Sequence, residues 1–337
     1  MKGDPLRPAS SASPVPILVL ALGGNAITRA GDEPSVEAQF RRSRETVEQL
    51  LPVFASRRWR VALTHGNGPQ VGNILLRSDL AAEAGELPRL PVATAVADTQ
   101  GGMGYMIQQS LANGLWESGM HSPVATVITQ VIVDEEHSAF EEPSKPIGRF
   151  YPADAVEELE RHGWTLREDP QSRGWRRVVA SPPPLEIVEQ PVIARLIDDG
   201  VIVIACGGGG IPVCSDAAGS LRSIEAVIDK DLASALLASS LDAHTLAILT
   251  EVDRIYLNFG EPSQEPLDLI DVGALEDLSS QGHFPPGSMG PKVEAVISFI
   301  RRGGERAIVT SPELLGRALD GRAGTQVVSA RLRATAS

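Results

Sequence analysis

The chain has 337 residues, of which 42% are hydrophobic and 22% are charged, a composition typical of globular proteins with about two domains. Its formal net charge of -13 argues against a broad basic surface for nucleic acid or anionic lipid, because such surfaces need clustered lysine and arginine. No apolar run reaches the roughly 18 residues that span a bilayer and the first residues contain no signal-peptide core, so we expect a cytoplasmic protein with a disordered tail at 1–15.

Short apolar runs alternate with amphipathic segments along most of the chain, which is typical of βαβ units around a mainly parallel sheet. In chain order we expect strands at 17–22, 60–64, 124–133, 201–205, 245–249, 307–310 and 325–328. We expect helices at 36–54, 70–82, 99–116, 192–197, 226–241, 291–302 and 312–319. The alternation therefore predicts an α/β fold.

Two stretches interrupt this alternation. Residues 134–184 contain several prolines and one short helix candidate at 153–161, which predicts an insertion with its own small subdomain. Residues 215–223 are rich in Gly, Ser and Ala and separate two alternating halves. We therefore predict a seam between two lobes at 215–223.

Three glycine clusters follow apolar strands: LGGNA at 22–26, HGNGPQ at 65–70 and CGGGGIP at 206–212. Glycine allows the backbone to approach a ligand closely, and a following helix N-terminus offers free N–H groups to an anion. One cluster is as often only a tight turn, but three at the carboxyl ends of parallel strands indicate a ligand site. The clusters match neither the GxxxxGK[ST] loop nor the GxGxxG fingerprint, which argues against an ordinary P-loop enzyme and a dinucleotide-dependent dehydrogenase.

Lysine is scarce in this chain: Lys2, Lys145, Lys230 and Lys292 are the only ones among 30 basic residues. Since arginine is the common basic side chain here, we interpret the three lysines outside the tail as compact point charges for phosphate groups, and Asp231 as the residue that holds them in place. The alternative for each lysine is a solvated surface side chain, and for Asp231 an acid that offsets the helix dipole. Glycine loops with several cations fit phosphoryl transfer, which depends mainly on positioning and charge.

These motifs and their order resemble carbamate kinases of the amino acid kinase superfamily. The resemblance runs from about residue 17 to residue 328 and rests on strings such as THGNGPQVGN, TQGGMGY, KPIGRFY, GWRRVV, CGGGGIPV, AVIDKDLAS and HFPPGSMGPK. The stretch from SKPIGRFY to GWRRVV is not shared by other members of the superfamily. The resemblance implies a three-layer αβα sandwich with an open, mainly parallel sheet, two lobes and a small protruding subdomain at about 134–184.

The resemblance also implies a function: reversible, direct in-line transfer of a phosphoryl group from ATP to carbamate, giving ADP and carbamoyl phosphate, with Mg²⁺ and in a homodimer. It implies that the lobe at 16–220 binds carbamate or carbamoyl phosphate and that the lobe at 221–337 binds the nucleotide. We name no metal ligands, because phosphate oxygens and water usually hold this ion.

The resemblance assigns roles to residues of this sequence. Catalytic roles fall on Lys145, Lys230, Asp231 and Lys292; substrate and phosphate binding on Gly23, Gly24, Asn25, Gly66, Asn67, Gly68, Gly208 and Gly209; and nucleotide binding on Thr250, Val252, Tyr256 and Met289. Other superfamily members often place a lysine before the first glycine pair, where this chain reads LALGG, so Lys145 is the most diagnostic of the three lysines.

Alternatives remain open. Another phosphotransferase of the same fold, acting on an amino acid carboxylate or a nucleoside monophosphate, would lack the stretch that carries Lys145, and a non-catalytic sensor would be expected to lose lysines or glycines. We interpret His65 and His137 as structural, because carbamate is already anionic and needs no general base. Cys206 and Cys214 match no zinc or redox spacing, so we predict two buried thiols.

Overall fold

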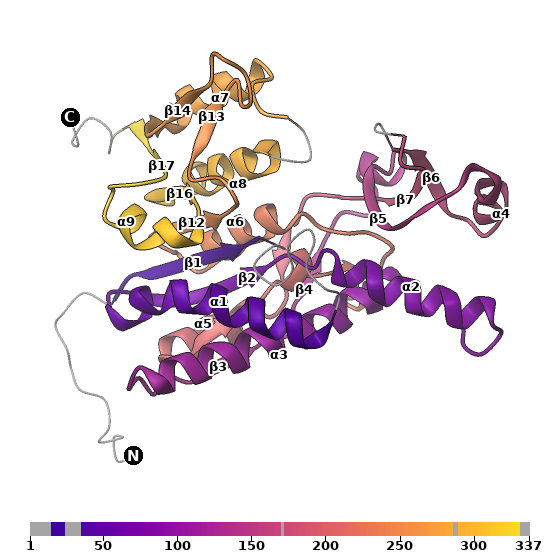
Figure 1. The fold of residues 1–337 in the computed structure, drawn as a ribbon, viewed down its shortest axis with the longest axis horizontal. Coiled ribbons are helices and arrows are strands. Elements are labelled where there is room, and N and C mark those ends of the chain that lie inside the picture. The colour runs from indigo at the N-terminus through magenta and orange to yellow at the C-terminus, as the bar shows by residue number, and fades with distance from the viewer. Residues whose placement is uncertain (1–14, 24–34, 170–171, 286–288, 331–337) are drawn as a thin grey trace.

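A central sheet of eight strands organises the structure, a computed structural model that describes residues 15–23, 35–169, 172–285 and 289–330 (Figure 1). From one edge to the other, the strands are β15 (Leu269–Asp271), β17 (Thr325–Val328), β16 (Arg306–Thr310), β12 (Thr245–Leu249), β1 (Ile17–Leu22), β2 (Arg60–His65), β9 (Ile202–Ile204) and β3 (Val124–Thr126). All neighbours in this sheet run parallel except β16 and β17. The prediction of an open, mainly parallel sheet is confirmed.

The central strand β1 has one core on each of its faces. Leu18, Leu20 and Leu22 belong to one buried cluster, and Val19 and Ala21 belong to another. The helices of the first cluster are α1 (Val36–Ala55), α3 (Val92–Glu117) and α9 (Leu315–Leu319), and those of the second are α5 (Gln190–Asp198), α6 (Lys230–Ser240), α7 (Val272–Ser280) and α8 (Met289–Arg301). Because helices cover both faces, every position of the strand is apolar and the fold is the predicted αβα sandwich.

The strand predicted at 124–133 is wrong as a single element. The structure divides it into β3 of the central sheet and β4 (Gln130–Ile132) of a second sheet. The buried amide of Gln100 accounts for the division, since it accepts a hydrogen bond from the N–H of Thr129 at 2.7 Å and donates one to the Thr129 carbonyl at 3.0 Å. The Thr129 carbonyl also accepts a hydrogen bond from the N–H of Ile211 at 2.9 Å, so the chain passes from the central sheet to the second sheet at this residue.

The second sheet has the order β11 (Leu221–Ser223), β10 (Ile211–Ser215), β4 and β8 (Glu186–Ile187). Residues 215–223, where the sequence predicts a seam, lie in the antiparallel hairpin of β10 and β11. The third glycine cluster forms the short 3-10 turn η4 (Gly207–Gly209) and continues into β10, so the prediction that it leads into a helix is wrong. The second cluster does lead into a helix, α2 (Gln70–Glu83).

The helix predicted at 226–241 begins later than expected, at Lys230, because Asp229 is its N-cap. The Asp229 carboxylate accepts hydrogen bonds from the N–H groups of Asp231 and Leu232, which have no carbonyl partner inside the helix. Four further elements of the second lobe were not predicted: the hairpin strands β13 (Ile255–Leu257) and β14 (Glu265–Leu267), the edge strand β15, and helix α7.

The stretch at 134–184 contains a small three-stranded sheet with the order β5 (Lys145–Tyr151), β7 (Trp175–Val179) and β6 (Thr165–Glu168). Figure 1 shows this sheet at the side of the main body. Its own small core consists of Tyr151, Leu159 and Leu166. We call this stretch the protruding subdomain. None of the helices in the described part of the chain is long and apolar enough to cross a membrane.

Candidate active site

The three glycine clusters lie at the carboxyl ends of the adjacent parallel strands β1, β2 and β9. Gly23 directly follows β1, whereas Gly24 and Asn25 lie outside the described residues. The sequence prediction that the clusters converge at one edge of the sheet is confirmed for the described residues, as expected for an open α/β sheet.

The second and third clusters pack directly on each other. A β-carbon on Gly207 would lie 2.5 Å from Nε2 of His65, and one on Gly208 would lie 2.3 Å from Nδ2 of Asn67. Gly208 also has a φ of +67°, a conformation that side chains other than glycine rarely adopt. The glycines are therefore required for the loops to approach this closely.

His65 is a structural residue, as predicted. Its Nδ1 donates a hydrogen bond to the carbonyl oxygen of Gly66 at 2.8 Å, and its ring is buried beneath Gly207. Burial lowers the pKa of His65, the hydrogen bond to Gly66 opposes this shift, and the nearby charge of Lys230 lowers it further. The imidazole is therefore neutral at physiological pH.

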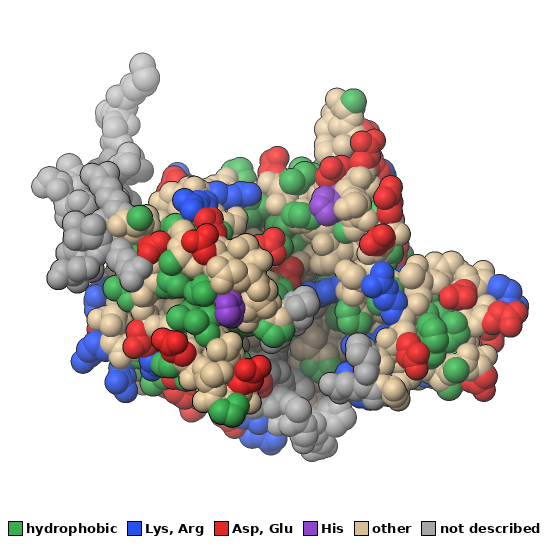
Figure 2. Space-filling view, turned by 90° about the horizontal axis from the view of Figure 1, so that it is seen from above, with side chains coloured by type: hydrophobic (Ala, Val, Ile, Leu, Met, Phe, Trp, Pro, Cys, Tyr) green, Lys and Arg blue, Asp and Glu red, His purple; other side chains and the backbone are tan. Residues whose placement is uncertain are grey.

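Two cavities open at this edge of the sheet. The first cavity has a volume of about 580 Å³ and lies between the glycine loops, β5 and the start of α6, where Figure 2 shows a hollow bordered by basic side chains. The predicted site residues in its wall include Gly66, Asn67, Gly68, Lys145, Gly208 and Asp231. The second cavity has a volume of about 920 Å³, and the predicted site residues in its wall are Gly23, Thr250, Val252, Tyr256 and Met289.

Lys230 and Lys292 lie at the boundary between these spaces. Among the described residues, they are the two that line both the first and the second cavity. Both lysines therefore lie where the two cavities adjoin. Two fixed cations at such a position can stabilise negative charge on a phosphoryl group during its transfer.

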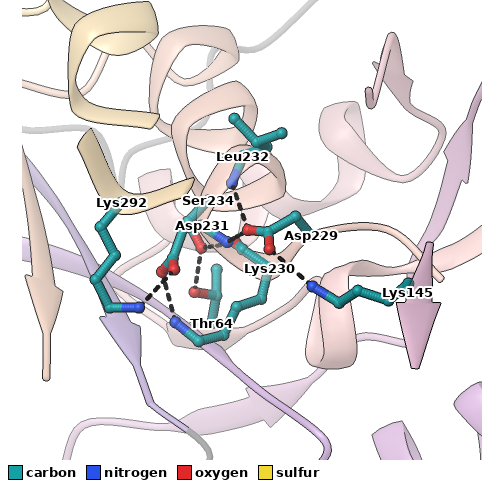
Figure 3. A network of polar contacts seen from close by, with 8 residues as sticks. All are labelled: Thr64, Lys145, Asp229, Lys230, Asp231, Leu232, Ser234 and Lys292. Atoms are coloured by element: carbon teal, nitrogen blue, oxygen red, sulfur yellow. Dashed lines mark hydrogen bonds and ion pairs between the residues drawn. The ribbon is translucent and has the colours of Figure 1, made fainter. Parts of the chain in front are cut away.

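A single carboxylate, that of Asp231, holds both lysines (Figure 3). Lys230 Nζ lies 2.5 Å from its Oδ1, and Lys292 Nζ lies 3.1 Å from its Oδ2. Although burial opposes ionisation of this carboxyl group, the charges of Lys230 and Lys292 lower the pKa of Asp231. Asp231 is thus an anion that bridges two cations.

Helix α6 is fixed to the sheet beneath this bridge. Ser234 lies one turn after Lys230, and its hydroxyl donates a hydrogen bond to the Lys230 carbonyl at 2.5 Å. The same hydroxyl lies 2.6 Å from the hydroxyl of Thr64 on β2. The first turn of α6 therefore has a defined position relative to the glycine loop that follows β2.

Lys145 reaches the site from the protruding subdomain. Its ammonium group lies 3.0 Å from Oδ2 of Asp229, while Oδ1 of the same residue caps α6. Sequence reasoning missed Asp229, although an aspartate directly before a helical segment is a recognised N-cap signal. One carboxylate therefore connects the protruding subdomain to the helix that carries Lys230.

Some predicted residues lie apart from the cavity walls, or in a different wall. Gly209 lines neither cavity; a β-carbon there would lie 2.3 Å from the carbonyl oxygen of Ile228, so this glycine allows the segment before α6 to pack closely. Gly23 lies in the wall of the second cavity, whereas the sequence grouped it with the substrate-binding glycines of the first. His137 accepts a hydrogen bond from the N–H of Ala139 at 3.1 Å and caps a 3-10 turn, a structural role as predicted.

The two cysteines are confirmed as buried free thiols. Burial raises the pKa of both Cys206 and Cys214, so neither is an activated nucleophile. Within the described ranges, no group of three or more His, Cys, Asp or Glu side chains is arranged to hold a metal ion.

Comparisons with known proteins agree on one family. A sequence model described as the amino acid kinase family matches residues 16–311. The chain is 46% identical over 312 residues to the carbamate kinase of Thermococcus kodakarensis, covering 92% of this chain and 98% of that protein. It is 45% identical over 314 residues to the carbamate kinase-like protein YahI of Escherichia coli, covering 93% of this chain and 98% of that protein.

Solved structures give the same result. The structure of carbamate kinase from Giardia lamblia bound to AMP-PNP matches with a TM-score of 0.88 and 40% identity, covering 93% of this chain and 98% of that one. N-acetylglutamate synthase from Neisseria gonorrhoeae matches with a TM-score of 0.52 at 14% identity, which is a similarity of fold alone.

Proposed function

Since the chain belongs to the amino acid kinase family, and within it to the carbamate kinases, we propose that it transfers a phosphoryl group between ATP and carbamate at the boundary of the two cavities. The reaction is reversible, with ADP and carbamoyl phosphate as the other pair of reactants. Its acceptor is a carboxylate-type oxygen, so no proton has to be removed before attack.

One observation carries this proposal: Lys230 and Lys292 line both cavities and share the buried carboxylate of Asp231. During transfer, charge spreads over the equatorial oxygens of the phosphoryl group, and fixed cations stabilise that charge. Because both lysines are already paired with Asp231, their positions are set before substrate binds. We assign Asp231 the role of positioning them.

We assign the second cavity to the nucleotide. Its volume of about 920 Å³ is within the range of pockets that bind small molecules and cofactors. Thr250, Val252, Tyr256 and Met289 contribute to its wall, and all four lie in the lobe that we place at 221–337. Tyr256 and Met289 offer apolar surface for a base, and Lys230 and Lys292 offer charge for the phosphate groups.

We assign the first cavity to carbamate or carbamoyl phosphate. Asn67, Gly68 and Gly208 of the glycine clusters line this cavity, and the lobe at 16–220 contains all three. Lys145 supplies a further cation from the protruding subdomain. Its pairing with Asp229 orients the ammonium group toward the start of α6, and we propose that this lysine contacts the phosphoryl group during transfer.

A kinase that uses ATP needs a divalent cation, and we propose Mg²⁺. When bound, this ion would neutralise part of the negative charge of the phosphate groups. We name no protein ligands for this ion, because phosphate oxygens and water usually hold it. By the same family resemblance we expect a cytoplasmic protein that forms a homodimer. Sedimentation analysis of the purified protein would test the homodimer.

The function is tested by a coupled assay for ATP formation from ADP and carbamoyl phosphate in the presence of Mg²⁺. We expect ATP formation by the wild-type protein and its loss on chelation of the metal. A second arm supplies ATP with N-acetylglutamate or a nucleoside monophosphate, where we expect no ADP formation. Absence of ATP in the first arm, or turnover in the second at a comparable rate, would refute the proposal.

A further inference from the structure

Arg176 on β7 differs from other arginines of the protruding subdomain in its charged partners among the described residues. Three of those arginines have a carboxylate partner: Arg149 pairs with Glu83 at 3.3 Å, Arg173 with Asp169 at 2.8 Å and Arg177 with Glu225 at 2.9 Å. Arg176 forms no ion pair with any carboxylate in the described part of the chain, although it lines the first cavity. Its charge is therefore available to a ligand.

The alternation of side chains along β7 explains this difference. Successive residues of a strand point to opposite faces, so Arg176 lies in the wall of the first cavity while Arg177 packs on the far face. There the Arg177 guanidinium lies 4.6 Å from the ring centre of Trp164. These neighbours in sequence thus provide a site residue and a matched control.

The guanidinium of Arg176 is held in position by contacts that leave its charge uncompensated. Its Nη2 donates a hydrogen bond to the carbonyl oxygen of Gly148 at 3.1 Å, and its central carbon lies 5.3 Å from the ring centre of Phe150. Its Nε is buried and has no hydrogen-bond partner among the described atoms. Burial lowers the pKa of Arg176, the charge of Arg173 lowers it further, and the charge of Asp169 opposes the shift.

The charged side chains around Arg176 favour the binding of an anion in the first cavity. Five basic and two acidic side chains are among the described residues that line the first cavity: Lys145, Arg149, Arg176, Lys230, Lys292, Asp229 and Asp231. Lys230 and Lys292 are already bound to Asp231, and Lys145 is bound to Asp229. In a chain with a net charge of -13, this local excess of positive charge can attract an anion that the rest of the surface repels.

We propose that Arg176 is a specificity-determining residue that binds the anionic substrate of the first cavity from the protruding subdomain: carbamate, the phosphoryl acceptor, in one direction and carbamoyl phosphate, the phosphoryl donor, in the other. The planar guanidinium offers two parallel N–H donors, a geometry that matches the oxygens of a carboxylate or a phosphate. Lys145, on the neighbouring strand β5, is then left to contact the transferred group. This inference depends on the assignment of the first cavity to the acceptor.

The test compares Arg176→Gln, Arg176→Lys and the control Arg177→Gln by initial rates of ATP formation from carbamoyl phosphate and ADP. We expect Arg176→Gln to raise the KM for carbamoyl phosphate about 10- to 100-fold, the effect of losing a hydrogen-bonded charge, with the KM for ADP unchanged. Arg176→Lys, which keeps the charge and loses the paired donors, should give an intermediate KM, and Arg177→Gln should leave both KM values unchanged.

Ionic strength provides a second readout, which a structural role would not alter. Added salt should raise the KM for carbamoyl phosphate in the wild type, and this dependence should be weaker in Arg176→Gln. The inference is overturned if KM for carbamoyl phosphate is unchanged in a folded Arg176 variant, if both KM values rise together, or if Arg177→Gln has the same effect. If the wild type forms no ATP, the proposed function itself fails; an active wild type with insensitive Arg176 variants refutes this inference alone.

Discussion

Three lysines meet at the proposed site: Lys230 and Lys292 are largely buried, and Lys145 is more exposed to solvent. Lys230 and Lys292 share the carboxylate of Asp231, whose side chain is 4% exposed, and the two lysine side chains are 16% and 17% exposed. Lys145 comes from the protruding subdomain, is 37% exposed and has one ion pair, with Asp229. The buried bridge of Lys230, Asp231 and Lys292 and the more exposed pair of Lys145 and Asp229 thus line the same cavity.

This difference separates two physical roles. A buried carboxylate with two cations is costly to disrupt, because removal of one partner leaves an uncompensated charge in a region of low polarity. An ion pair at a cavity edge contributes little free energy, because water screens it and the two side chains lose conformational freedom. Lys230 and Lys292 are therefore fixed before binding, whereas Lys145 can exchange Asp229 for an anionic ligand at small cost.

The largest effect is expected from Lys292→Ala. Removing one of the two cations at the cavity boundary should lower kcat by about 10³- to 10⁵-fold, as for other cations that stabilise phosphoryl transfer. Stability should fall as well, by about 1–3 kcal/mol, since Asp231 loses a charged hydrogen bond. Lys292→Arg should not restore kcat, because a guanidinium does not fit the position of a compact ammonium group. Measurement of kcat alongside denaturant unfolding checks both parts.

Lys145→Ala should lower kcat by about 10³-fold without the loss of stability. Its ion pair with Asp229 is partly exposed, so the free energy of unfolding should change by less than about 1 kcal/mol. The same kinetic and unfolding measurements serve here. Full activity of this variant would exclude Lys145 from catalysis, and a large loss of stability would contradict the contrast between the two groups of lysines.

Two conservative changes compare the carboxylates directly. Asp231→Asn should lower the free energy of unfolding by about 3–5 kcal/mol, because two buried ammonium groups lose their shared anion. Asp229→Asn should cost less than about 1 kcal/mol, because asparagine is as good an N-cap as aspartate and only the pair with Lys145 is lost. Urea unfolding of both variants makes the comparison, and equal losses would show that the bridge is no more important for stability than the cap.

The smallest expected effect is a pH dependence of the difference in unfolding free energy between the wild type and Asp231→Asn. The pKa of Asp231 in the folded protein is below its ordinary value of 3.8, so its contribution is fully present above pH 3.8 and is lost as pH falls through the folded-state pKa. Asp231→Asn has no proton to gain at this position. The difference in unfolding free energy between wild type and variant should therefore be constant from about pH 7 to 5 and should narrow below about pH 4. A difference that widens in acid would show that the assigned direction of the shift is wrong.

The central sheet and the proposed site differ in how far the sequence predicted them. β1, β12 and β17 were predicted with the observed bounds. β1 is a continuous apolar run, as expected for a strand with helices on both faces, and such a run is visible locally. The glycine clusters were recognised for a similar reason, since each directly follows such a run. Scarcity of lysine then directed attention to three positions, and the structure brings these three positions to one cavity.

The remaining features depend on contacts between distant segments. The strand predicted at 124–133 is interrupted at Thr129, whose backbone bonds to the side chain of Gln100 on helix α3. The local sequence pattern of the strand does not reveal this contact. Lys292 meets Asp231 across 61 residues, and Lys145 meets Asp229 across 84. A charged side chain shows no periodicity that identifies its partner, so these pairs cannot be read from spacing.

The sequence by itself determined the layers of the fold, the edge of the sheet where a ligand would bind and the set of cations available to it. Tertiary structure decided which of these cations share a buried anion, which side chain of the Arg176 and Arg177 pair faces the cavity, and that Lys230 and Lys292 border both spaces. Apolar burial leaves a local, periodic pattern in the chain, whereas electrostatic pairing depends only on where distant residues meet in space.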